Sequence, residues 1–320
     1  MIQGPLAVTL NVLEITILTF VVANIVISAV VSVFSPSLLK IQVSSRKALL
    51  WLVVLLPWLV GMAIAAYFLN GYFTSSIFET ELGNAHWHHM EVFTWLSWHG
   101  IVMLSALAFS LYLVINKAIQ FFRHRMDLSL LTSMSTLKDA GYYEVATQDA
   151  SAFTAGFIRK KCFVTEGLLK EVESRELGII LQHEKAHAKN NDPLKKWLFS
   201  IFSAFFVKPV ASHLRLHMTL AMEHDADNAV VSDDDSSLFV ASTLVKIARL
   251  NASGSTVRDS EMVTNFGADV LEQRIYFLLG QLDLKPLNKA LAALFIVAVV
   301  GVSLSSVDKI HHFIEIIFNH

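Results

Sequence analysis

The sequence QHEKAHAKNNDPL at residues 182–194 decides how the rest of the chain is interpreted. The apolar residues before it have helical spacing, so the motif is predicted to lie on a helix. Because four residues separate His183 from His187, their imidazoles lie one above the other on one helix face, where both can reach a single metal ion. Glu184 projects beside them as the candidate catalytic base. Two histidines on a helix face are often only surface residues. A metal site is therefore indicated only if a third ligand can be found.

A candidate third ligand lies in a second polar stretch, EHDAD at residues 223–227. Glu223 can complete a two-histidine, one-glutamate zinc site that leaves a fourth position for water. Asp227 is one helical turn further on, where a carboxylate can hold a ligand histidine by its other ring nitrogen. The alternatives are His224 or Asp225 as the ligand, although each points about 100° or more away from Glu223, and a solvated charged helix face without a metal. The predicted site is one Zn²⁺ per chain, with the ligands His183, His187 and Glu223 and the catalytic base Glu184.

The composition places much of the chain in lipid. The sequence is 54% hydrophobic with only 16% charged residues, which is too apolar for an ordinary soluble protein. Four stretches reach the roughly 20 apolar residues that a membrane-spanning helix needs, and the first is expected to be a retained helix rather than a signal peptide. The predicted spans are 8–33, 48–69, 99–118 and 287–307.

Charge and cysteine content exclude other kinds of site. The net charge of −2 excludes a basic surface for direct nucleic-acid binding. Cys162 is the single cysteine, so the chain can form neither an internal disulfide framework nor a multi-thiolate zinc site. Any metal ion must therefore be held by histidines and carboxylates.

Positive charge indicates the side of the membrane on which each segment lies. Lysines and arginines follow spans 1 and 3, with Arg46 and Lys47 among them, whereas the loop 70–98 contains neither residue type. This loop and both termini are therefore expected outside the cell, and the long segment 119–286 is expected in the cytoplasm.

The predicted fold is a mostly α membrane protein with four transmembrane helices and a small α+β, zincin-like metallopeptidase domain inserted between spans 3 and 4. Residues 1–118 form the N-terminal membrane region, 119–286 the cytoplasmic domain, and 287–320 the fourth span with a short external tail. Within the domain, an apolar run too short to cross a bilayer predicts a helix on the membrane surface at about 194–214.

Local patterns predict the first elements of the cytoplasmic domain. Residues 127–140 have helical periodicity, and 142–147 and 162–165 are typical of short strands on either side of a turn-prone stretch at 149–161. Ser174 is a suitable N-cap for the helix that carries the two histidines.

Residues 151–279 resemble integral-membrane zinc peptidases of the BlaR/MecR type, a gluzincin family that includes antibiotic-sensing signal transducers. The resemblance implies a four-span endopeptidase of a bacterial cytoplasmic membrane. It also implies transmembrane signalling by hydrolysis of a cytoplasmic protein, commonly a DNA-binding repressor, or of the peptidase itself. The landmarks lie at 153–156, 164–169, 183–194, 223–231 and 271–275.

The chain departs from the antibiotic sensors of that family. Those sensors carry a large external penicillin-binding domain after span 4, and residues 308–320 leave no room for one. We therefore expect a short form without β-lactam recognition. Its activating signal and its oligomeric state stay open, and a homo-oligomer is one of the alternatives.

Three other functions compete with this interpretation. HtpX-like and prenyl-protein proteases, which act in membrane-protein quality control, share both motifs, but two further spans usually separate them, whereas here only residues 188–222 intervene. A non-catalytic membrane receptor is disfavoured because it would not need Glu184. A transporter is disfavoured because it would place ionisable groups in the middle of the membrane.

Several further residues have candidate roles. Arg274 can pair with Asp227 or steady a substrate carbonyl, or it is an exposed helix arginine. The strand at 163–165 is a candidate edge for an extended substrate, with an ordinary packed hairpin as the alternative. The polar linker 251–261 is a candidate site of self-cleavage, with an inert surface loop as the alternative.

The external segments are rich in histidine, which suits a metal or pH sensor. The neighbouring tryptophans and phenylalanines more simply indicate a helix at the membrane interface. The histidines of these segments are His86, His88, His89, His99, His311 and His312.

Overall fold

The computed structural model describes residues 1–74, 92–231, 234–254 and 261–318. The chain is mostly helical, as predicted. Four of the described helices are long and apolar enough to cross a membrane, and they cover the four predicted spans. They are α1 (Pro5–Phe34), α2 (Val43–Thr74), α3 (Trp98–Ser133) and α10 (Lys289–Phe318).

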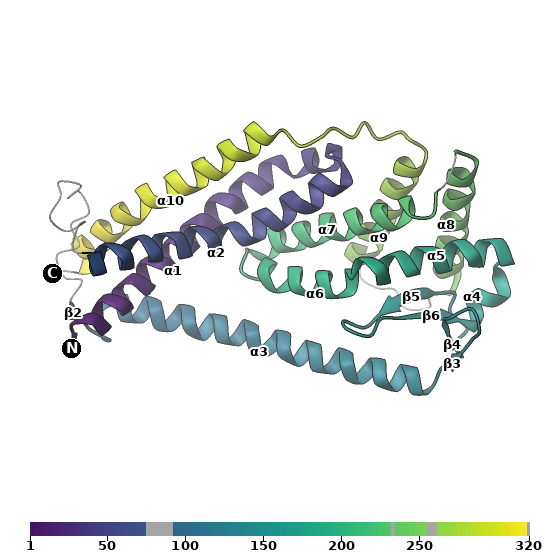
Figure 1. Ribbon diagram of the computed structural model, residues 1–320, viewed down its shortest axis with the longest axis horizontal. Coiled ribbons are helices and arrows are strands. Elements are labelled where there is room, and N and C mark those ends of the chain that lie inside the picture. Colours follow the sequence, from purple (N-terminus) through teal and green to yellow (C-terminus); the bar gives the residue numbers. More distant parts are fainter. Residues whose placement is uncertain (75–91, 232–233, 255–260, 319–320) are drawn as a thin grey trace.

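Helices α1, α2 and α10 lie together, whereas α3 runs along the other side of the molecule (Figure 1). In its most apolar stretch α3 is 11% buried, as is α10, compared with 39% for α1 and 44% for α2. The core between α1 and α2 consists of aliphatic side chains such as Val12, Ile27 and Leu50. Near the chain termini a two-stranded sheet joins β1 (Ile2–Gln3) to β2 (Val92–Phe93). The face of α3 that the protein leaves uncovered is therefore apolar.

Helix α3 continues far beyond its predicted span. It ends at Ser133, so the separate helix expected at 127–140 does not exist, and residues 136–137 form a strand instead. The physical reason is that residues 119–133 contain neither glycine nor proline. A change from apolar to mixed composition does not interrupt the hydrogen bonds of a helix.

A four-stranded sheet follows α3, with the strand order β3-β4-β6-β5. Strands β4 and β6 are parallel, whereas β5 pairs with β6 antiparallel, with Phe153 opposite Phe163. One face of the sheet packs on α5 and the other on Leu128 and Leu131 of α3. The strands are β3 (Thr136–Leu137), β4 (Tyr143–Val145), β5 (Ala152–Ala155) and β6 (Lys161–Thr165).

The sheet corrects two predictions. Strand β5 lies in the stretch 149–161, which was expected to be a turn. The small and polar residues of this stretch do not indicate a strand by themselves, and the strand is stabilised by pairing with β6. The predicted substrate edge at 163–165 is wrong, because β6 is paired on both sides. The free edge on that side of the sheet belongs to β5.

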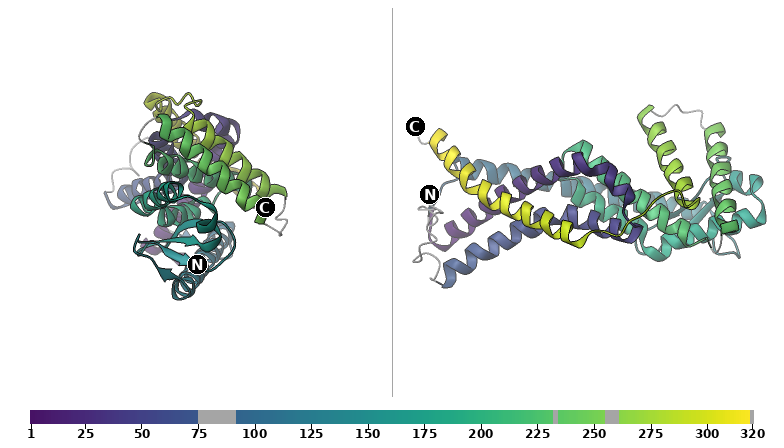
Figure 2. Two further views of the ribbon diagram at one scale, coloured as in Figure 1. Left: turned by 90° about the vertical axis from the view of Figure 1, so that its right-hand side faces the viewer. Right: turned by 90° about the horizontal axis from the view of Figure 1, so that it is seen from above.

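The remaining described helices complete the domain on the side of the molecule away from the chain termini, and α6 and α7 lie alongside α2 (Figures 1 and 2). The cap of α5 is Glu173 rather than Ser174. Its side chain and that of Glu176 form a reciprocal capping box, which leaves Ser174 as the first helical residue. The helices are α4 (Glu166–Glu171), α5 (Ser174–Asn190), α6 (Asp192–Ser203), α7 (Lys208–Asn228), α8 (Asp234–Gly254) and α9 (Glu261–Leu278).

Two helices, α6 and α7, replace the single helix expected at 194–214. The chain turns at 204–207, directly before Lys208 and Pro209, because a proline is tolerated in the first turn of a helix but not in its interior. The apolar side chains of α6 pack on α2, where the ring of Phe199 lies 5.3 Å from that of Trp51. The apolar run is thus covered by protein along this face.

Candidate metal centre

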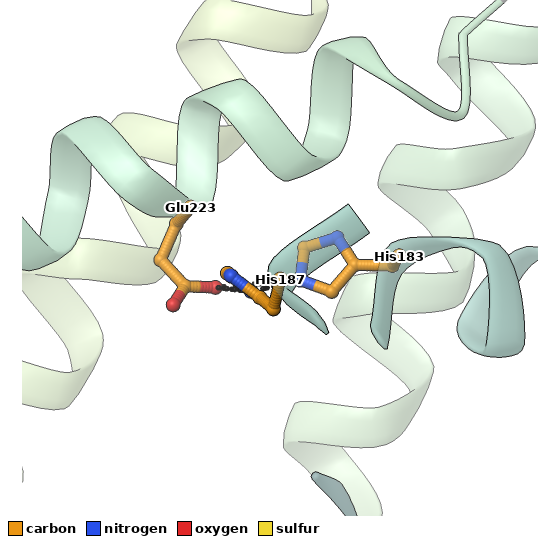
Figure 3. Close-up of side chains that lie close together, drawn as sticks. All are labelled: His183, His187 and Glu223. Atoms are coloured by element: carbon orange, nitrogen blue, oxygen red, sulfur yellow. Dashed lines mark hydrogen bonds and ion pairs between the residues drawn. The ribbon is translucent and has the colours of Figure 1, made fainter. Parts of the chain in front are cut away.

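Three side chains from α5 and α7 converge (Figure 3). The Nε2 atoms of His183 and His187 are 3.1 Å apart, and Oε2 of Glu223 lies 3.4 Å and 3.6 Å from them. Ligand atoms around a tetrahedral zinc ion, at about 2.0–2.1 Å from the metal, are about 3.3 Å apart. Within the described part of the chain this is the group of His, Cys, Asp and Glu side chains that could hold a metal ion. The donors therefore fit Zn²⁺ in both chemistry and spacing.

Local structure explains how α5 presents the two histidines. One face of the helix carries Ile180 and Leu181, which pack on the sheet, and this packing fixes the rotation of the helix. The helix ends at Asn190, and Asn191 follows with φ 59°, the left-handed conformation that asparagine tolerates. This turn redirects the chain, so that Asp192 lies beside His187.

A carboxylate holds the Nδ1 atom of each histidine, so that Nε2 faces the centre. Nδ1 of His183 is 3.1 Å from Oδ1 of Asp227, and Nδ1 of His187 is 2.7 Å from Oδ2 of Asp192. The first pair was predicted. Asp192 was not among the predicted site residues. An acidic residue immediately beyond a helix with two ligand histidines is the signal that could have found it.

The carboxylates change the proton affinity of the ring that each one holds. Burial alone would lower the pKa of His187, but its hydrogen bonds with Asp192 and Glu223 outweigh burial and raise the pKa to about 9. Burial also opposes protonation of His183, yet Asp227 and Glu223 raise its pKa. Both rings therefore hold a proton more tightly than an ordinary histidine.

Glu223 stays ionised in spite of its burial. Burial would raise its pKa, but His183, His187 and the positive charges of Arg274 and Lys196 hold it well below the usual range. Nζ of Lys196 is 3.3 Å from Oε1, the carboxylate oxygen that faces away from the histidines. The glutamate is thus a charged ligand with one oxygen directed at the centre.

Arg274 of α9 pairs with Asp227, which was one of its predicted roles. Its Nε and Nη2 atoms donate to the two oxygens of that carboxylate at 2.8 Å and 2.6 Å. Nη1 lies 3.3 Å from Oε2 of Glu223. Burial would raise the pKa of Asp227, but Arg274 and His183 keep it low. A buried network thus connects α9 to both motifs.

Glu184 is buried in the wall of a cavity of about 630 Å³. The same cavity is lined by the three candidate ligands and by β5. The hydroxyl of Thr154 on β5 donates to the backbone carbonyl of Glu184 at 2.8 Å. The free edge of the sheet is thereby tied to the helix turn that carries the candidate base.

The two alternative ligands on α7 point away from the centre. Nδ1 of His224 is 2.8 Å from a guanidinium nitrogen of Arg46 on α2, and its ring stacks on Phe277. Burial and then Arg46 lower the pKa of His224 to about 4. Asp225 instead accepts a hydrogen bond from Lys47 of α2. Neither residue joins the group with His183.

Other candidate residues lie apart from the centre. His99 contacts Glu14, a buried residue of α1. His86, His88 and His89 lie outside the described residues, as do the side chains of His311 and His312. The predicted linker is helical up to Gly254 and from Glu261 onward, and residues 255–260 between them are likewise outside the description.

One comparison with known proteins gives a match that covers the residues of this centre. A search of curated proteins finds no match. Residues 123–276, just under half of the chain, match the model of Peptidase family M48. This segment contains both motifs and the residues of the centre, namely His183, His187, Asp192, Glu223, Asp227 and Arg274. The match therefore supports the assignment of residues 123–276 to the M48 family of metallopeptidases.

Proposed function

We propose that the protein is a zinc-dependent endopeptidase of the bacterial cytoplasmic membrane. The observation that carries the proposal is the group of His183, His187 and Glu223, whose donor atoms lie 3.1–3.6 Å apart beside Glu184 in one cavity. The M48 match and the four long apolar helices support the peptidase chemistry and the membrane setting.

In this proposal the two histidines and Glu223 hold the ion, and Asp192 and Asp227 orient the histidines. The chemistry that Zn²⁺ supplies in such a group is polarisation of the scissile carbonyl and a lowered pKa, about 7, for water. Glu184, as general base, takes a proton from the attacking water and returns it to the leaving amine. Hydrolysis is direct, without an acyl-enzyme.

The free edge of β5 suits the backbone of an extended peptide. It borders the cavity along Ala152–Ala155, and the hydrogen bond from Thr154 keeps it in register with Glu184. Main-chain hydrogen bonds along a sheet edge tolerate varied side chains, as a protein substrate requires. This edge takes over the role that was first expected of residues 163–165.

We further propose that the substrate is a cytoplasmic protein, with a DNA-binding repressor as the first candidate, and that cleavage transmits a signal across the membrane. The resemblance to BlaR/MecR-type peptidases supports this role. Quality control in the manner of HtpX-like proteases would use the same centre, so the identity of the substrate separates the two. Comparing the proteomes of cells that carry wild type and Glu184→Gln identifies the substrate.

The membrane topology can be tested separately. Both termini and loop 70–98 are placed outside, and the peptidase domain is placed in the cytoplasm, from the positive-inside rule. A chemical label should reach a reporter near Gly83 in intact cells, but should reach one near Gly254 only after the membrane is opened. Equal accessibility at both positions would contradict the four-span topology.

Self-processing is part of the proposal. A cut in or shortly after the linker 251–261 would release a C-terminal fragment of roughly 60 to 70 residues. Wild type should accumulate this fragment and Glu184→Gln should not. If both proteins give the same fragment, or if wild type gives none while it cleaves another protein, the chain does not process itself.

The decisive experiment combines metal analysis with an activity assay on the purified protein. His183→Ala, His187→Ala and Glu223→Ala should each lose most of the bound zinc. Glu184→Gln should keep the zinc and lose about a hundredfold or more of the activity, because it removes the base and no ligand. Lys189→Gln, an exposed change on the same helix, is the matched control and should alter neither. Stoichiometric zinc in Glu223→Ala would refute the ligand assignment.

A further inference from the structure

The cavity at the metal centre has two chemically different ends. At one end Val240, Leu244 and Ile247 of α8 line it, and Ala152 at the start of β5 lines the same cavity and packs against the same hydrophobic cluster as Ile247. At the other end it is lined by Phe157, which follows β5, and by Trp197 of α6. A peptide that lies along β5 therefore passes from an aliphatic end to an aromatic end, with Glu184 in the same cavity.

The aromatic end is assembled from three separate elements. The Phe157 ring stacks on Phe121 of α3, with ring centroids 5.1 Å apart and an interplanar angle of 11°. Trp197 lies 5.6 Å from Phe157 and 5.2 Å from Phe121. His124 of α3 closes the group at 4.8 Å from Phe157. Because each ring supports the next, the wall has a defined shape.

This wall has a fixed position relative to the metal centre. Trp197 lies on α6, whose first residue, Asp192, holds the ring of His187. Phe157 follows β5, which the Thr154 hydroxyl joins to the backbone of Glu184. Both aromatic side chains are thus connected to the reacting groups through short, hydrogen-bonded segments.

The wall also has unmet hydrogen-bonding capacity. The indole nitrogen of Trp197 and Nε2 of His124 are buried, and neither has a hydrogen-bond partner among the described residues. A buried polar atom without a partner is energetically unfavourable. The indole N–H can only donate, so its missing partner is an acceptor such as a peptide carbonyl.

We propose that Phe157 and Trp197 form a side-chain subsite that selects substrates with a large apolar residue, preferably an aromatic one, close to the scissile bond. This inference rests on the proposed peptidase function and names its substrate class. An aromatic side chain buries its faces against the two rings and gains the offset or edge-to-face contacts that aromatic pairs prefer. A lysine or glutamate would lose hydration against the two rings, which carry no charge to compensate.

The test is a set of fluorogenic peptides that share one backbone and differ at single positions on either side of the scissile bond. Wild type should show, at one position, a kcat/KM about tenfold or more higher for Phe or Tyr than for Ala. Trp197→Ala and Phe157→Ala should reduce this ratio toward one at that position. The ratio is informative even where a variant lowers the absolute rate.

Controls separate the subsite from a general defect. Leu244→Ala removes side chain from the aliphatic end and should keep the aromatic ratio at that position. Zinc content and thermal unfolding establish that each variant is folded, and Trp197→Phe and Phe157→Leu replace an alanine variant that does not fold. Aromatic selectivity should survive in Trp197→Phe.

The outcomes distinguish the subsite from the peptidase activity itself. Hydrolysis that Glu184→Gln abolishes, but that shows no aromatic preference or keeps it in Trp197→Ala and Phe157→Ala, overturns the subsite and leaves the peptidase intact. Hydrolysis that is equal in wild type and Glu184→Gln overturns the peptidase, and the subsite with it.

Discussion

His183 and His187 are the same residue type, four positions apart, but different neighbours hold them. Asp192 is the first residue of α6, directly after the turn that ends their own helix, whereas Asp227 comes from α7 and is itself held by Arg274. Each carboxylate keeps the Nδ1 proton in place and leaves Nε2 for a metal ion. The orientation of the rings therefore depends on two acids of different origin.

We expect Asp192→Asn and Asp227→Asn each to weaken zinc affinity by about 10- to 100-fold without removing a ligand. The effect of Asp227→Asn should be the larger, because it also leaves Arg274 without its paired carboxylate. Competition with a chelator of known affinity measures both. Unchanged affinity in either variant would show that its carboxylate does not orient the histidine.

The raised pKa of His187 predicts how zinc binding depends on pH. At neutral pH the metal-free ring is protonated, because its pKa is about 9, and an incoming ion must displace that proton. Zinc affinity should therefore rise as the pH increases toward about 9, by up to tenfold per unit for each displaced proton. Affinity measured in metal buffers between pH 6.5 and 8.5 tests this.

The stability of the metal-free protein should depend on pH with the opposite sign. A raised pKa stabilises the folded state fully below the unfolded value of about 6.5, and this stabilisation is lost as the pH rises through about 9. Asp192→Asn removes the main partner of His187 and should flatten both pH dependences. A zinc affinity that does not change with pH would contradict the assignment.

Two glycines, one at the start of α4 and one directly after β5, lie where the backbone conformation or a close backbone contact excludes a side chain. Gly167 lies in the first turn of α4, where an added Cβ would be 2.0 Å from the backbone oxygen of Gln148. Gly156, which directly follows β5, has φ +104°, a conformation that residues with a side chain rarely adopt. Gly167 is needed where the start of α4 passes the backbone of Gln148, and Gly156 is needed where the chain leaves β5.

Gly167→Ala should destabilise the domain by about 2 kcal/mol or more, because rigid backbone has to move to admit the methyl group. Gly178→Ala is the matched control. It lies on α5, where an added Cβ meets nothing within 4 Å, so it should stabilise the helix by about 0.5–1 kcal/mol. Thermal unfolding in detergent compares the two. Equal effects would refute the close approach at Gly167.

The peptidase domain is joined to the membrane helices through α2. Arg46 is 0% exposed and contacts His224, while Lys47 pairs with Asp225, so two consecutive residues of α2 hold the segment of α7 that carries Glu223. The segments before α2 and α10 are also paired, since the backbone nitrogen of Gln42 donates to the carbonyl of Lys285 at 2.9 Å. A movement of α2 would therefore change the position of Glu223 in the metal centre.

Arg46→Met should lower the unfolding temperature and weaken zinc binding, because it removes a buried hydrogen bond of a charged group, about 1.5–3 kcal/mol, next to the ligand helix. Arg46→Lys should restore part of both properties. Lys40→Gln, an exposed change nearby, is the control. Wild-type zinc affinity in a folded Arg46→Met protein would show that α2 does not position Glu223.

Local sequence patterns were sufficient to predict some features of the helices and of the candidate site. A helix repeats every 3.6 residues, so the spacing of His183 and His187 places them on one face whatever surrounds them, and a long apolar run forms a helix that can cross a bilayer. The two motifs also singled out Glu223 and Asp227, because a metal site needs a third donor and its histidines need partners. The rest depended on contacts between residues far apart in the chain.

Tertiary contacts decided the features that short-range patterns did not contain. Strand β5 is an edge because β6 pairs with β4, and Asp192 reaches His187 because Asn191 adopts a left-handed turn. Arg46 followed the expected pattern of a cytoplasmic surface charge, yet it is buried against α7. Sheet order and the burial of a charge depend on which elements meet in space, and a period of two or of 3.6 residues carries no information about those partners.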